Sequence, residues 1–210
     1  MKFLCILAVC ALASAADDAP AKIGFTKSFP GSSPAYVSIT LDRTGAVVYN
    51  ETTDEDNAEN LQLEDFATRE IFVLAQKLDY FTRPVESGLK VAFMGAKSFR
   101  WESGNQKNEV KFNYSVDENA ADLWDRFERI AESERAFMEL KRAVRHDKLG
   151  VMDALNATVD LWDRRRLVGE TQLLPLLDRI AGDEVYMHIA RQRAAELSEA
   201  IRAALKLPSA

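Results

Sequence analysis

Alternating apolar and polar residues mark a pair of strands near the start of the chain. Val37, Ile39 and Leu41 alternate with polar or aromatic neighbours, which is the period of a strand with one buried face. The segment 42–45, Asp-Arg-Thr-Gly, supplies a turn, and the alternation then resumes as far as Tyr49. The pattern predicts a β-hairpin over residues 36–49, which needs further elements on its apolar face because a lone hairpin is marginal in water.

A second stretch with the same period covers residues 98–114. Phe99 and Trp101 alternate with polar residues before a Ser-Gly-Asn turn, and Val110 and Phe112 alternate with polar residues after it. This stretch predicts a second antiparallel hairpin.

Helical periodicity follows each of the two hairpins. Apolar residues recur every three or four positions over residues 63–81 and again over 117–146, and from residue 149 onward every pattern is helical. We therefore predict an α+β fold with an antiparallel four-stranded sheet in ββαββα order, followed by a C-terminal helical hairpin or bundle. The spacing leaves open whether the last helices pack on the sheet or form a separate bundle.

The first residues have the three parts of an export signal. Lys2 is followed by an apolar run over residues 3–12 and by Ala-Ser-Ala at 13–15, and the run is shorter than the roughly 20 residues that span a bilayer. We predict a signal peptide at 1–15, a flexible leader at 16–34, a sheet domain at 35–147 and a helical region at 148–207. The mature protein is then periplasmic or secreted, with no membrane span.

Cysteine content and net charge indicate the cellular compartment and the kind of partner. Cys5 and Cys10 both lie in the predicted signal, so the mature chain has no cysteine, and a bacterial periplasm suits it better than a eukaryotic secretory route. Loss of Lys2 changes the formal net charge from −6 to −7. This acidity argues against nucleic acid as a partner, because such binding depends on neutralising phosphates.

Two groups of residues are candidates for metal ligands, although no cofactor is predicted. Asp54, Asp56 and Asp65 fit three positions of a calcium loop in an acidic segment, and a solvated acidic loop is the alternative. Glu184 and His188 are four residues apart, which would place them on one helical face as half of a zinc site or as a surface contact.

The sequence contains none of the common catalytic motifs. It has no nucleophile elbow, no phosphate-binding loop and no dinucleotide-binding glycine motif. Its many carboxylates do not single out an acid–base pair. Enzymatic activity is therefore unsupported by the sequence but not excluded.

Charged and polar side chains suggest two binding surfaces. The run at 164–166 is Arg-Arg-Arg, which either complements the dipole of a helix C-terminus or binds an anion or a partner. The outward face of the second hairpin either is an ordinary solvated sheet face or docks a partner. The predicted contact residues on that face are Arg100, Glu102, Glu109, Lys111 and Asn113.

The spacing Pro-x-Tyr-x-x-Ile from Pro34, followed by Gly-x-Val-x-Tyr from Gly45, carries a resemblance to a known group. Together with the helix and hairpin that follow, it resembles a group of uncharacterised bacterial secreted domains over residues 34–131. The resemblance implies a hairpin–helix–hairpin–helix pattern and no particular activity.

Three functions are consistent with these patterns. The leading prediction is a non-catalytic periplasmic or secreted module that binds an envelope or secreted protein. The alternative is a hydrolase or metal-dependent enzyme of an unrecognised type. A third possibility is a carrier of a small ligand, with a cavity between the sheet and the C-terminal helices.

Overall fold

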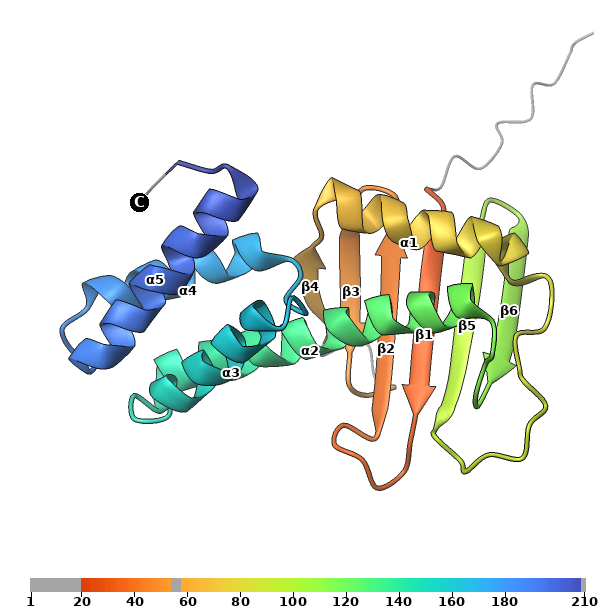
Figure 1. Cartoon of the computed structure of the whole chain (residues 1–210), viewed down its shortest axis with the longest axis horizontal. Coiled ribbons are helices and arrows are strands. Elements are labelled where there is room, and N and C mark those ends of the chain that lie inside the picture. Colours follow the sequence, from red (N-terminus) through yellow and green to blue (C-terminus); the bar gives the residue numbers. More distant parts are fainter. Residues whose placement is uncertain (1–19, 54–57, 209–210) are drawn as a thin grey trace, which may run out of the picture.

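A computed structural model describes residues 20–53 and 58–208 of the protein, and these residues form one antiparallel sheet with helices. Six strands lie in the order β4-β3-β2-β1-β5-β6 (Figure 1). Their bounds are β1 Lys22–Ser28, β2 Tyr36–Asp42, β3 Ala46–Asn50, β4 Glu59–Gln62, β5 Ala96–Ser103 and β6 Gln106–Phe112.

The described helices follow the strands in two groups. One α-helix stands between β4 and β5, and the others follow β6. The α-helices are α1 Asp65–Lys77, α2 Glu118–His146, α3 Val151–Asp163, α4 Leu174–Gly182 and α5 His188–Leu205, with short 3₁₀ turns η2 Asp79–Phe81 and η3 Glu170–Leu173.

The α+β class and the antiparallel sheet are confirmed, but the four-strand prediction is wrong. The sheet gains β1 from the predicted leader and β4 from the residues just before the helix predicted at 63–81. The element order is therefore ββββαββα. Strand β1 lies at the centre of the sheet, with β2 on one side and β5 on the other, so the prediction of a flexible leader is wrong for Lys22–Ser28.

Both predicted hairpins are present, as β2–β3 and β5–β6. The first turn is held by Asp42, whose Oδ1 accepts hydrogen bonds from the backbone N–H groups of Thr44 and Ala46. Gly45 in this turn has a φ of 85°, which glycine adopts without the steric cost of a Cβ.

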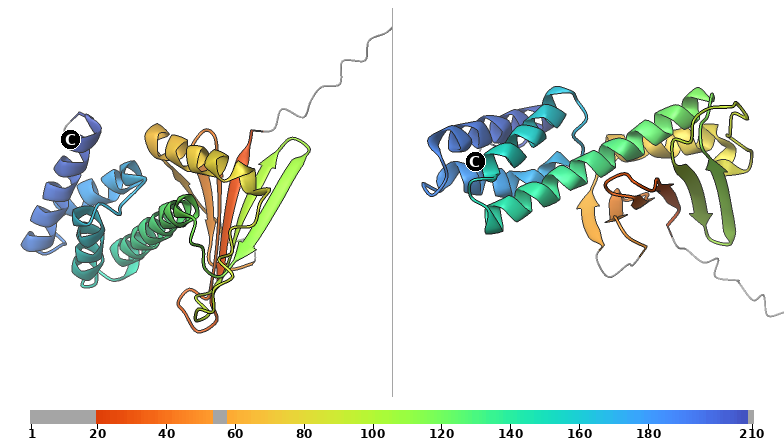
Figure 2. Two further views of the ribbon diagram at one scale, coloured as in Figure 1. Left: turned by 45° about the vertical axis from the view of Figure 1, so that its right-hand side comes forward. Right: turned by 90° about the horizontal axis from the view of Figure 1, so that it is seen from below.

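Helices α1 and α2 cover one face of the sheet (Figure 2). The Phe25 ring of β1 stacks on Phe127 of α2 with centroids 5.1 Å apart, and Phe81 stacks on Phe99 of β5 at 5.4 Å. Asp117 caps the start of α2, and its carboxylate accepts hydrogen bonds from two N–H groups of the first turn. None of the described helices lies over the opposite face of the sheet.

Helix α2 belongs to two hydrophobic cores. Its first half, with Leu123 and Phe127, packs in the core of the sheet. Its second half, with Leu140 and Val144, lies in a separate core with α3, α4 and α5. We call these regions the sheet part and the helical part. The C-terminal helices thus form a bundle built on the end of α2 that extends beyond the sheet (Figures 1 and 2).

Candidate functional site

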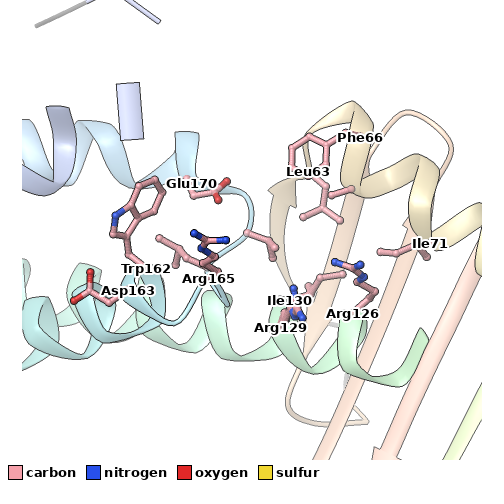
Figure 3. A pocket seen from close by; sticks show the side chains of 13 residues that line it. Leu63, Phe66, Ile71, Arg126, Arg129, Ile130, Trp162, Asp163, Arg165 and Glu170 are labelled. Carbon is pink, nitrogen blue, oxygen red and sulfur yellow. The ribbon is translucent and has the colours of Figure 1, made fainter. Parts of the chain in front are cut away.

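A cavity of about 450 Å³ lies where the sheet part meets the helical part. Its walls come from α1, α2, the end of α3 and the segment that leads to η3 (Figure 3). The lining residues are Leu63, Phe66, Ala67, Ile71, Arg126, Arg129, Ile130, Trp162, Asp163, Arg165, Leu167, Val168 and Glu170.

Most of the cavity wall is apolar. Leu63, Ile71 and Ile130 are at most 2% exposed and form part of the sheet core. Phe66, by contrast, is 55% exposed, and Figure 3 shows it across the cavity from Trp162. An apolar concavity with a few polar groups is the usual form of a small-molecule site.

Three guanidinium groups also line the cavity. Arg126 pairs with Glu70 at 3.3 Å, and Arg129 pairs with Asp125 at 2.7 Å. The Nε of Arg129 is buried and has no hydrogen-bond partner within the described residues. Over residues 20–53 and 58–208, the Arg165 side chain has neither an ion pair nor a hydrogen bond. The carboxylate of Asp163 lines the same cavity, and Arg165 is exposed to solvent. The groups left without a protein partner in the described residues are therefore the Arg165 guanidinium and the buried Nε of Arg129.

The backbone at the end of α3 fixes the position of Arg165. The N–H of Arg166 donates to the carbonyl of Leu161, and the N–H of Arg165 donates to that of Trp162. These two hydrogen bonds define a Schellman motif, in which the residue after the helix cap takes the left-handed conformation. That residue is Arg165, with a φ of 55°, at a position where glycine is the usual choice.

Two carboxyl groups meet beside the cavity. Glu64, just before α1, accepts a hydrogen bond from the N–H of Gly169, and it also contacts Glu170 at the start of η3. Burial, with the nearby charge of Glu64, raises the pKa of Glu170 to about 7. Glu64 Oε1 and Glu170 Oε2 are buried without a donor in the described structure, and protonation of Glu170, whose pKa is raised, would supply one.

The residues predicted on the sheet face are mostly where the sequence placed them. Arg100 lies opposite Glu109 in the register of β5 and β6, and its guanidinium is 3.9 Å from Glu102. Lys111 lies opposite Ser98 on the same face. Asn113 is different, since its side-chain amide bonds the backbone of Met94 and Ala92 and so holds the loop before β5.

The structure does not assemble a metal site within the residues it describes. Asp54 and Asp56 lie outside those residues, and Asp65 is the first residue of α1. In the described part of the chain, no group of three or more His, Cys, Asp or Glu side chains could hold a metal ion. Because α5 begins at His188, Glu184 precedes the helix, and the prediction of a shared helical face is wrong.

Comparison with models of known protein families finds no match, and a search of curated proteins finds no relative. Among the described helices, none has the length and apolar character needed to cross a membrane.

Sequence reasoning did not identify the cavity, although one of its signals was present. The arginine run contained Arg165, but its partner arginines on α2 lie nearly 40 positions earlier within an ordinary charged helix. Only the packing of α3 against α2 brings them together. Arg166, in contrast, has a structural role, since it pairs with Asp125 at 2.9 Å and ties the end of α3 to α2.

Proposed function

We propose that this protein is an exported, non-catalytic binding module whose ligand site is the cavity between the sheet part and the helical part. One observation carries the proposal, namely an apolar-walled cavity of about 450 Å³ at the junction of two packed cores. Small-molecule sites are typically about 300–1,000 Å³ and tend to lie at such junctions.

The open face of the sheet supports binding less well than the cavity does. Charged side chains on this face pair with one another, since Glu102 lies 3.9 Å from Arg100 and 3.8 Å from Lys107. Gly24 and Thr26 at its centre are small. Protein interfaces usually have an apolar, fully desolvated centre. The docking of an envelope or secreted protein on this face stays a prediction of the sequence.

Filling the cavity tests the proposal. Ala67 lines the cavity on α1, so Ala67→Phe should block it, whereas Val73→Phe adds bulk at a position that is 49% exposed on the same helix. The probe is N-phenyl-1-naphthylamine, a neutral apolar fluorophore. We expect its emission to rise with wild type and with Val73→Phe but not with Ala67→Phe. Equal emission for both variants would remove the cavity as the site.

A hydrolase is the second candidate function, and one observation favours it. Glu170 lines the cavity and its pKa is raised to about 7, which suits a general acid at neutral pH. A panel of chromogenic esters and glycosides tests this role with wild type and Glu170→Gln. Turnover that disappears in Glu170→Gln would support the enzyme, and the absence of turnover across the panel would count against it.

Export is part of the proposal and has its own test. The support is the charged, apolar and Ala-Ser-Ala sequence over residues 1–15. Expression of the full chain in a bacterium, followed by N-terminal sequencing of the periplasmic and culture fractions, should yield a chain that begins at Ala16. A full-length chain found only in the cytoplasm would contradict it.

A further inference from the structure

Arg165 occupies a backbone position that disfavours it. Its φ of 55° follows from the Schellman motif at the end of α3, and a residue with a Cβ is strained there relative to glycine. Strain of this kind tends to accumulate where a side chain serves a function. The motif places the Arg165 guanidinium in the cavity, between Trp162 and Ile130 (Figure 3).

Three guanidinium groups and the carboxyl groups of Asp163 and Glu170 line the cavity, and two of the guanidinium groups keep N–H donors without a partner among the described residues. Arg126 and Arg129 already have acidic neighbours at 3.3 and 2.7 Å, but Arg129 Nε is buried without a partner and the Arg165 guanidinium is unpaired among the described residues. An unpaired buried donor is costly. Guanidinium groups match carboxylate, sulfonate and phosphate oxygens in geometry as well as charge.

The rest of the wall has the opposite character. Leu63, Phe66 and Ile130 present hydrocarbon surface to the same cavity, and so does the indole of Trp162. A ligand that covers this surface is apolar over most of its length, because burial of apolar area provides the main favourable free energy.

We propose that the cavity binds a small organic anion with an apolar body, such as a medium-chain carboxylate. The anionic group pairs with Arg165 and Arg129, and the apolar body lies against Leu63, Phe66, Ile130 and Trp162. This inference rests on the proposed function, since it names the class of ligand for the same cavity.

The test compares three ligands that share a ten-carbon chain and differ in the head group. Decanoate, decan-1-ol and decyltrimethylammonium, each below its micelle concentration, are titrated into the mature protein. Binding is followed by the fluorescence of Trp162 and by amide chemical shifts. A Trp162→Phe variant identifies the part of the fluorescence change that arises in the cavity.

Two variants isolate the guanidinium of Arg165. Arg165→Gly removes it and relaxes the backbone, so this variant is expected to fold at least as stably as wild type. Arg164→Ala removes the same charge from the adjacent residue, whose guanidinium bonds the carbonyl of Asp160 and does not line the cavity. Equal thermal stability is checked for both variants before titration.

We expect decanoate to bind at least about tenfold more tightly than decan-1-ol, because a hydrogen bond between a guanidinium and a carboxylate is stronger than one between a guanidinium and a neutral hydroxyl. Arg165→Gly should remove this difference by weakening the binding of decanoate much more than that of decan-1-ol, whereas Arg164→Ala should behave like wild type.

Other outcomes separate the two proposals. If decanoate and decan-1-ol bind equally in the cavity and Arg165→Gly changes neither affinity, the ligand is not selected for its negative charge. This result would overturn the proposal of an anionic ligand but not the proposal that the cavity is a binding site. No cavity response to any of the three ligands would overturn both. If the protein attaches to phosphatidylglycerol vesicles but does not bind free decanoate, its arginines contact an anionic membrane surface and not a small ligand. This result would also overturn the proposal.

Discussion

At the scale of single residues, the junction between the two parts contains acids that burial keeps partly protonated. Glu134 of α2 is completely buried, and its Oε2 accepts a hydrogen bond from Gln172 of η3. Burial raises its pKa from the ordinary 4.5 to about 7. The folded state therefore binds this proton more tightly than the unfolded state does.

The raised pKa of Glu134 predicts how stability depends on pH. A carboxyl with a raised pKa contributes most below pH 4.5, and the contribution is lost as pH rises to about 7. Glu134→Gln removes this loss, so the variant should be more stable than wild type at pH 8 by about 1–3 kcal/mol. Urea unfolding at pH 5 and pH 8 measures the difference.

The control for this prediction is Glu139→Gln on the same helix. Glu139 is exposed and pairs with Arg142, so its removal should change stability by less than about 1 kcal/mol, and in the opposite direction. A Glu134→Gln variant that is less stable than wild type at pH 8 would show that the charged form of Glu134 is the favoured one.

Glu170 predicts a pH dependence of ligand binding rather than of stability alone. Its pKa is about 7, and it faces the cavity together with Asp163, Arg165 and the two arginines of α2, with Glu64 behind it. Ionisation at higher pH adds a negative charge near a bound anion. The affinity for decanoate should therefore fall about three- to tenfold from pH 6 to pH 8.

Isothermal titration calorimetry at several pH values checks this prediction. Glu170→Gln should make the affinity for decanoate independent of pH over this range, and decan-1-ol should show no pH dependence with either protein. A decanoate affinity that rises with pH would contradict the placement of the anion beside Glu170.

At the scale of elements, the sequence predicts the strands in which apolar and polar residues alternate regularly, and it does not predict strands β1 and β4. Strands β2, β3, β5 and β6 were predictable because apolar and polar residues alternate on both sides of a turn. Strand β1 has only Ile23 and Phe25 as apolar markers, separated by Gly24, and a glycine with nearby prolines is typical of a loop. Its neighbour β2 follows directly in the chain, but its other neighbour, β5, comes from a distant part of the chain, so local patterns could not place β1 at the centre.

The central position of β1 predicts a large effect of one substitution. Phe25 is 1% exposed and stacks on Phe127, so Phe25→Ala should lower the free energy of unfolding by about 3–5 kcal/mol. Phe29→Ala is the matched control, because Phe29 lies just after the strand and is 36% exposed. Chemical denaturation compares the two, and a similar small effect for both would contradict a buried central β1.

At the scale of the whole molecule, α2 makes the candidate site possible. A single helix of 29 residues carries the sheet core at one end and the helical core at the other. The cavity lies above its middle, where Arg126, Arg129 and Ile130 face it. The sequence suggested a cavity between sheet and helices only as one possibility, because its walls come from segments up to about 100 residues apart.

The most direct measurement is a crystal structure of the mature protein with 10-bromodecanoate, in which anomalous scattering locates the bromine. We predict a bromine peak within the cavity between α1 and Trp162, with the carboxylate within hydrogen-bond distance of the Arg165 guanidinium. A bromine peak on the open face of the sheet, or an empty cavity at saturating ligand, would contradict the account.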